Sequence, residues 1–475
     1  MQDRYEVPAC AVGWLRSMGY EPYQAMDGDV QRWLGWYTGR GKFYERAQVD
    51  WSSGEPRRVT RTAYSLRPAR RVCREWASLL FDEGTRFAAD GPRANEWLQG
   101  WCDRAGVLSE GQSCVERAFA LGTGALALSF DLPADAARPA TMRLRRYDAR
   151  MVLPLSWDGA TVTECAFATD AFVRGRRVSQ VTAHVVGEAG TYEIRSAWFD
   201  AEGERVHPEG LLDALDTGQA LPTFAVVRPA IDNLVADLAP MGQSVFEDAV
   251  DAIRGVDEAW DALVRELAVC KPRVFLDDQL LRVTDSGGHE VMVPLAPEES
   301  VVRAVRGSGT GGDLIKTFQP AIRTAQMREA LDTALAELGD LTGFGQQYFT
   351  LSKSGGLKTA TEVSADSSAL MRNLRKHEMA VGASLSSMLT AAVSCAGAVL
   401  GEDVPAPSER VRVLWDDSII EDTPAEKAQA LSEVAGGLLA PWEYRARFLG
   451  EDEETARAMA DEAARGGMGG VGALV

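Results

Sequence analysis

The chain contains few of the residues that build metal and redox sites. Its 475 residues include four histidines and seven cysteines. The histidines show neither H-x-x-x-H nor H-E-x-x-H spacing, which argues against a zinc hydrolase. The cysteines are scattered, odd in number and without a C-x-x-C pair. We therefore expect reduced thiols in a cytosol, with neither a disulfide framework nor a zinc site.

Nucleotide-binding and nucleophile motifs are also missing. No G-x-S-x-G occurs, and the glycine-rich piece 307–312 lacks the G-K-[ST] ending of a phosphate-binding loop. We therefore expect no catalytic residue, no cofactor and no bound metal, and the chain is not expected to be an enzyme. One alternative stays open, a metal-dependent hydrolase that uses the carboxylate pair Asp416 and Asp417, since divalent metals bind carboxylates. A turn between a strand and a helix is the more ordinary reason for such a pair.

Positive charge is scarce in this sequence. Lysine and arginine number 50 against 69 acidic residues, which gives a formal net charge of −19. A protein that grips DNA by neutralising phosphates needs a basic surface. We therefore expect no tight or sequence-specific DNA binding, whereas an acidic wall is compatible with a duplex that must slide.

One long uncharged run raises the question of a membrane. The N-terminal stretch "MQDRYEVPACAVGWLRSMGYEP" has no apolar signal core, so export is not expected. Residues 379–401 carry no charge and are long enough to span a bilayer. They also carry four serines and a threonine, and their helical pattern continues upstream through charged residues. A buried helix without a membrane is the favoured interpretation, and a membrane span is the alternative.

Length and pattern predict an α+β protein of two or more domains. The first 130 residues are mainly helical by periodicity; in 70–81, for example, Val72, Trp76, Leu79 and Leu80 share one face. Residues 141–228 change to short apolar runs split by Gly and Asp, which is typical of strands. The capping boxes that predict helix starts are Ser109 with Gln112, Ser244 with Glu247, Thr359 with Glu362, and Thr423 with Glu426.

The helix predicted to start at Ser244 is amphipathic and ends at Lys271-Pro272, where proline excludes continuation. Its charged face includes Glu247 and Asp261. Its apolar stripe must find neighbours, and the predicted packing residues are Phe246, Ile253, Trp260, Leu263 and Leu267. A β-rich segment and a second helix, about 320–341, follow.

Residues 359–399 read as one long helix. No proline interrupts them, so at ~1.5 Å per residue the helix extends roughly 60 Å. A helix of this length without an enzyme motif indicates a structural part of a large assembly.

The order of these elements resembles the portal proteins of siphovirus-type tailed bacteriophages. The segments that carry the resemblance run in the family's order: "RVCREWASLLFDEG", "RMVLPLSWDGATVTECAFAT", "PMGQSVFEDAVDAIRGVDEAWDALVRELAVCKPRVFL", "LKTATEVSADSSALMRNLRKHE" and "LWDDSIIEDTPAEKAQALSEVAGGLLAPWEYRARFLG". The resemblance implies an α+β, portal-like fold with long helices, β-rich wing and clip segments and a small helical C-terminal crown. Its implied parts are a wing (1–240), a first stem helix (241–271), a clip (272–318), a second stem helix (319–342), a tunnel loop (343–358), a long helix with a wing strand (359–421), and a crown with a flexible tail (422–475).

The resemblance also implies a function and partners. Such proteins form a homo-oligomeric ring, usually of twelve copies, at one vertex of the virion capsid, and assemble in the cytoplasm of the host bacterium. Double-stranded DNA passes through the ring during packaging and ejection. The implied partners are the terminase large subunit, a head-completion adaptor, and the major capsid and scaffolding proteins. Another phage head or head-completion protein is the competing interpretation.

The segment 343–358, "GFGQQYFTLSKSGGLK", is the predicted tunnel loop. Its candidate residues are Gln346, Gln347, Tyr348, Lys353 and Lys358. Its glycines allow backbone conformations that other residues resist, and loops of this length are often functional. The alternative is a hairpin in the wing whose Tyr348, Phe349 and Leu351 pack as core.

Overall fold

The computed structural model describes residues 5–50, 56–131, 139, 141–159, 161–173, 175–208, 212–236, 239–270, 273–277, 282–284, 287–292, 302–305, 315–318, 321–351, 360–416, 430–434, 436–449 and 456–460. The chain divides into two compact units, Met1–Trp415 and Asp416–Val475. Helix and sheet are mixed, as the α+β prediction requires.

The N-terminal part of the first unit is mainly helical. Its helices are α1 (Ala9–Ser17), α2 (Asp27–Thr38), α3 (Pro68–Leu80), α4 (Pro92–Ala105) and α5 (Val107–Leu121), with the 3-10 turn η1 (Lys42–Tyr44) after α2. Val72, Trp76 and Leu80 of α3 are buried, as their spacing predicts. The predicted helix start at Ser109 is wrong: left-handed Gly106 joins α4 to α5, and the Ser109 hydroxyl donates to the Gly106 carbonyl at 3.0 Å inside the first turn.

The predicted β region forms two antiparallel sheets. The larger has the order β10-β9-β8-β7-β6, with β11 also paired to β9, and the smaller has the order β12-β4-β5. The strands are β4 (Gly124–Asp131), β5 (Thr141–Asp148), β6 (Val152–Asp158), β7 (Thr161–Val173), β8 (Arg176–Val186), β9 (Tyr192–Phe199), β10 (Arg205–Val206), β11 (Ala214–Asp216) and β12 (Phe224–Val227). Helix α1 packs on the larger sheet through Ala11 and Leu15, and the Tyr147 and Phe167 rings stack between the two sheets.

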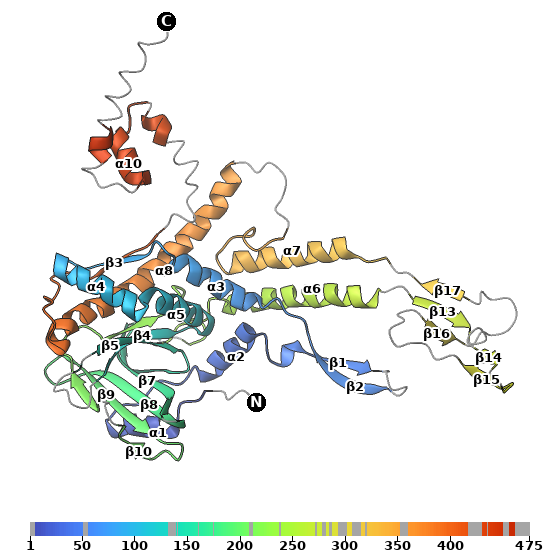
Figure 1. Cartoon of the computed structure of the whole chain (residues 1–475), viewed down its shortest axis with the longest axis horizontal. Helices are drawn as coiled ribbons and strands as arrows, with labels where there is room; N and C mark the ends of the chain where they lie inside the picture. The colour runs from blue at the N-terminus through green and yellow to red at the C-terminus, as the bar shows by residue number, and fades with distance from the viewer. Residues whose placement is uncertain are drawn as a thin grey trace, which may run out of the picture. The chain divides into compact units, whose positions relative to one another are not determined.

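Two long helices follow the sheets. Helix α6 (Val250–Val269) begins after the 3-10 turn η2 (Glu247–Ala249), and α7 (Thr324–Leu341) lies beside it (Figure 1). Between them the chain forms a three-stranded sheet, β16-β13-β17, and a two-stranded one, β14-β15. These strands are β13 (Arg273–Asp277), β14 (Arg282–Thr284), β15 (Glu290–Met292), β16 (Val302–Val305) and β17 (Ile315–Phe318).

The long helix is present as predicted. Helix α8 (Ala360–Cys395) continues into a π-helical turn (Ala396–Leu400). The capping box predicted at Thr359 and Glu362 lies outside the residues whose side chains are described. Strand β18 (Arg412–Leu414) then pairs with β3 (Arg86–Ala88).

The apolar half of α8 is a helix of the protein core. Ala369–Leu400 is long and apolar enough to cross a membrane, but 61% of its most apolar window is buried inside the molecule. It contacts α3, α4, β4, β12 and β18. Packing of this kind favours the buried-helix interpretation over the membrane span.

The second unit is described in part. It contains α10 (Pro441–Leu449), and the Arg457 guanidinium lies 4.4 Å from the centre of the Trp442 ring. The capping box predicted at Thr423 and Glu426, and the glycine-rich tail, lie outside the described residues.

Candidate functional site

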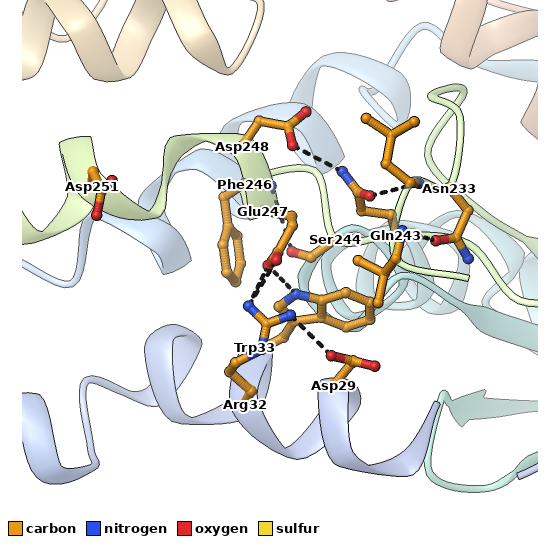
Figure 2. A network of polar contacts seen from close by, with 12 residues as sticks. Asp29, Arg32, Trp33, Asn233, Gln243, Ser244, Phe246, Glu247, Asp248 and Asp251 are labelled. Atoms are coloured by element: carbon orange, nitrogen blue, oxygen red, sulfur yellow. Dashed lines mark hydrogen bonds and ion pairs between the residues drawn. The ribbon is translucent and has the colours of Figure 1, made fainter. Parts of the chain in front are cut away.

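The start of α6 is fixed to α2 by one carboxylate (Figure 2). The Glu247 carboxylate accepts hydrogen bonds from Arg32 Nη1 at 2.7 and 2.9 Å and from Trp33 Nε1 at 2.5 Å. Arg32 also forms an ion pair with Asp29 at 3.0 Å, and Trp33 is fully buried. The buried indole N–H therefore depends on Glu247 for its hydrogen bond.

The capping box predicted at Ser244 and Glu247 is wrong. The Ser244 hydroxyl donates to the Phe119 carbonyl of α5 at 3.2 Å, and no side chain caps α6. The Glu247 carboxylate is used by α2, so α6 begins at Val250 after a 3-10 turn. Sequence spacing detects local capping partners, but here both side chains have distant partners that spacing does not reveal.

The loop before α6 is held by a second set of polar contacts. Gln243 is buried; its Oε1 accepts from the Leu234 N–H at 3.0 Å, and its Nε2 donates to Asp248 at 3.3 Å. Asn233 donates to the Met241 carbonyl at 2.9 Å (Figure 2). These contacts hold the start of α6 in a defined position, because buried polar groups that are satisfied in this way are costly to separate.

The predicted packing residues pass from the core to the surface along α6. Phe246 and Ile253 are fully buried, Trp260 and Leu263 are half-buried, and Leu267 is 50% exposed. The far half of the apolar stripe is thus only partly covered by the chain itself.

Two carboxylates of α6, Asp257 and Asp261, bind residues just before β1, within β2 and just after β2. Asp261 was predicted on the charged face of the helix, and it is buried. Asp257 accepts hydrogen bonds from the Tyr44 hydroxyl, the Ser65 hydroxyl and the Leu66 N–H at 2.8, 2.8 and 2.9 Å. Asp261 forms two hydrogen bonds with Arg61, at 2.8 and 2.5 Å. Burial raises the pKa of Asp257, whereas the hydrogen bonds from Arg61 lower the pKa of Asp261.

Helices α6 and α7 are antiparallel and closely packed. A Cβ atom on Gly255 would lie 3.7 Å from the Ala334 Cβ, and Arg323 before α7 donates two 3.0 Å hydrogen bonds to Glu266 near the end of α6. The buried residues of α7 are Leu331, Leu335, Leu338 and Gly339. The pair is therefore joined both at its middle and at its far end.

The described part of the predicted tunnel loop packs against α3. Phe344 and Phe349 are buried, and the Phe344 ring centre lies 4.3 Å from that of Trp76. Gln346 and Gln347 are exposed, and Tyr348, which is 37% exposed, donates from its hydroxyl to Glu75 at 3.0 Å.

The burial of Phe349 therefore agrees with the alternative, in which this segment packs as core. Leu351, however, is 52% exposed, and 343–351 contains no strand, so the hairpin of that alternative is absent from these residues. Lys353 and Lys358 lie outside the described residues.

Among the described residues, no group of three or more His, Cys, Asp or Glu side chains is arranged to hold a metal. Asp416 belongs to the described part of the chain and Asp417 does not. Burial lowers the pKa of His184 to about 3 and that of His377 to about 4, so both rings are neutral at pH 7. His184 forms a hydrogen bond with the Thr223 hydroxyl, and His377 accepts one from the Ala230 N–H. These contacts are structural roles for both rings.

The seven cysteines are free thiols, five of them buried. Burial raises the pKa of Cys114 and Cys395 to about 12, so these thiols are protonated and unreactive at neutral pH.

Comparison with known proteins identifies no family. No protein-family model matches the chain, and no curated protein matches it. Three similar solved chains come from particles described as "Virion of native gene transfer agent (GTA) particle", "Neck of native GTA particle computed with C12 symmetry" and "Neck of empty GTA particle computed with C6 symmetry". Their TM-scores are 0.42, 0.41 and 0.41, and their identities are 12%, 12% and 13%. The alignments cover 93%, 93% and 92% of this chain and 99%, 99% and 97% of the others. At these identities and TM-scores the likeness establishes neither a common family nor a common function.

Proposed function

We propose that the chain is a portal-type protein of a tailed-phage particle. In this proposal it forms a closed ring at one capsid vertex, and the ring is the channel for DNA packaging and ejection. The terminase large subunit, a head-completion adaptor and the capsid and scaffolding proteins are the partners that contact the ring.

The antiparallel pair α6–α7 is the observation that carries this proposal. The pair is fixed at its base by Glu247 and Gln243, and the chain between the two helices forms small sheets. Leu267 is 50% exposed in a single chain. An apolar stripe of this kind is covered when identical helix pairs stand side by side around an axis.

Closed rings with a central hole are the expected result of electron microscopy and native mass spectrometry on the purified protein. Leu267→Asp is expected to reduce ring formation while the chain stays folded, because a charge would replace an apolar contact between copies. Phe172→Asp is the matched control, since Phe172 is 74% exposed on β7, away from the helix pair. A protein that stays monomeric both alone and with its capsid and scaffolding proteins would reject the proposal.

The same images separate the competing functions. If the chain is another head or head-completion protein, we expect the images to show no closed ring with a central channel. The metal-dependent hydrolase requires bound metal. Elemental analysis that finds no metal in the purified protein, or a hydrolytic activity that is unchanged by Asp417→Asn, would remove that alternative.

A further inference from the structure

The strands β1 (Glu45–Asp50) and β2 (Arg57–Thr62) form an isolated antiparallel ribbon. Neither strand pairs with a third one among the described residues. A two-stranded ribbon without a packed face is marginally stable in water. This ribbon nevertheless has a defined position, because Asp257 and Asp261 of α6 bind the residues at its base.

The two faces of the ribbon differ. Arg46 and Arg61 are cross-strand partners, and both form ion pairs with α6, with Glu258 at 3.5 Å and Asp261 at 2.5 Å. Side chains alternate between faces along a strand, so the next pairs in register form the outward face. Its residues are Ala47 opposite Thr60, Val49 opposite Arg58, and Glu45 opposite Thr62, all of them exposed. Small and β-branched side chains thus occupy the middle of an uncovered β surface.

The ribbon and α7 lie on opposite sides of α6. Gly255 faces Ala334 of α7, whereas Asp257 and Asp261 face the ribbon. At 3.6 residues per turn, Asp257 and Asp261 are rotated by about 200° and 240° from Gly255. The three elements are therefore in the order ribbon, α6, α7, and Figure 1 shows the same order.

The outer side of α7 is a shallow surface that carries side chains of both charges, and one of them, the Asp332 carboxylate, accepts a hydrogen bond from the Leu351 N–H at 2.7 Å. Counted from Ala334, Ala325 and Glu329 are rotated by about 180° and 220°, so they point away from α6. A hollow of ≈ 420 Å³ on this side is lined by Ala325, Arg328, Glu329, Asp332 and Thr333. Ile322, just before the helix, is 48% exposed.

We propose that the outward face of the ribbon docks on the outer side of α7 in a second copy of this chain. The apolar side chains of Ala47 and Val49 complement those of Ile322 and Ala325, and the positive charge of Arg58 complements the carboxylate of Glu329. The contact joins two different surfaces on opposite sides of one chain, which is the head-to-tail arrangement that closes into rings. The inference rests on the ring proposed above and names the surfaces that build it.

Crosslinking tests the contact directly. Thr60→Cys with Ala325→Cys is expected to give, on oxidation, a ladder of covalent oligomers that ends at the closed ring. Each single variant measures crosslinking through the native thiols. Thr60→Cys with Thr161→Cys, which places the second thiol at an exposed position on β7, measures non-specific crosslinking between exposed thiols. Rings that form normally but give no ladder above these controls would overturn this inference and leave the proposed function standing. A wild-type chain that does not self-associate would overturn both.

Charge reversal gives a second readout that does not depend on new thiols. Arg58→Glu or Glu329→Arg is expected to raise the concentration needed for half-assembly by about tenfold or more, because like charges would meet across the contact. The double variant is expected to recover much of the loss. Arg104→Glu, at an exposed position at the end of α4, is the control. Equal assembly of the single variants and the wild type would contradict the proposed contact.

Discussion

Single polar side chains that are buried or half-buried determine how α6 is attached to the rest of the protein. Glu247 is the clearest case, since one carboxylate satisfies both a surface guanidinium and the N–H of the fully buried Trp33. Asp257 and Asp261 act in the same way on the residues around β2. Each of these contacts joins residues that are about 200 positions apart in the sequence.

Replacement of Glu247 by alanine is expected to lower the free energy of unfolding by about 1–3 kcal/mol, because the buried Trp33 N–H loses its partner. Glu258→Ala on α6 is the matched control; Glu258 is 63% exposed and has one 3.5 Å ion pair, so a change within about 0.5 kcal/mol is expected. Urea unfolding of the two variants measures the difference. An equal decrease of the unfolding free energy in both variants would show that the hydrogen bond between Glu247 and Trp33 contributes no more to stability than an exposed ion pair.

Stability is expected to fall between pH 6.5 and about 4 because of His377. Burial is the main cause that lowers its pKa from 6.5 to about 4, with Lys376 as a second cause. In this window the unfolded chain binds the proton and the folded chain does not, so acid favours unfolding, with a slope of up to about 1.4 kcal/mol per pH unit.

His377→Gln tests this pH dependence. Glutamine can still accept the Ala230 N–H and carries no titrating group, so the slope of unfolding free energy against pH is expected to be smaller. The buried His184 contributes a slope of its own in the same direction, and it is unchanged in the variant. His207→Gln, at a side chain that is 61% exposed, is the control. A variant with the wild-type slope would show that His377 is not the source.

At the scale of elements, close approaches of glycine determine where helices and loops meet. Gly339 of α7 lies under the loop that follows it, and a Cβ atom there would be 2.3 Å from the Gly345 carbonyl oxygen. Gly255 of α6 has ordinary space, with Ala334 at 3.7 Å. Position 339 therefore has no room for a side chain, whereas position 255 has room for a methyl group.

Alanine at these two glycines is expected to act with opposite sign. Gly255→Ala should stabilise the protein by up to about 1 kcal/mol, through helix propensity and a less flexible unfolded chain. Gly339→Ala should destabilise it by about 1–3 kcal/mol, since the backbone of the loop must move. Thermal unfolding of both variants gives the comparison, and stabilisation by Gly339→Ala would contradict the packing described for residues 343–349.

At the scale of the whole molecule, charge limits what the protein can do with DNA. A formal net charge of −19 repels phosphates at long range, so the protein has little electrostatic basis for binding DNA tightly. We expect binding to duplex DNA to be no tighter than non-specific, Kd ~10⁻⁴ to 10⁻⁶ M at physiological salt, without preference for sequence. Fluorescence anisotropy with two unrelated duplexes over a range of salt concentrations measures this. Nanomolar binding to one of them would be incompatible with a channel through which DNA slides.

The sequence by itself determined the class and position of most elements. The apolar periodicity of 70–81 and the strand patterns of 141–228 depend on side chains close in the chain, and the long helix depends on an unbroken run of helix-compatible residues. The position at which α6 ends also depends on the local sequence, because proline at 272 excludes continuation of the helix. The resemblance to portal proteins rests on this same order of segments.

Only the tertiary structure decided which polar residues cap helices and which join distant elements. Ser244 and Glu247 have the spacing of a capping box, yet their partners are Phe119, Arg32 and Trp33. Asp261 lies on the predicted charged face of the helix, yet it is buried and binds Arg61. A hydrogen-bonding side chain takes the partner that folding brings within about 3 Å, and that partner is set by the packing of α2, α5 and β2 around α6. Local spacing carries no information about this packing.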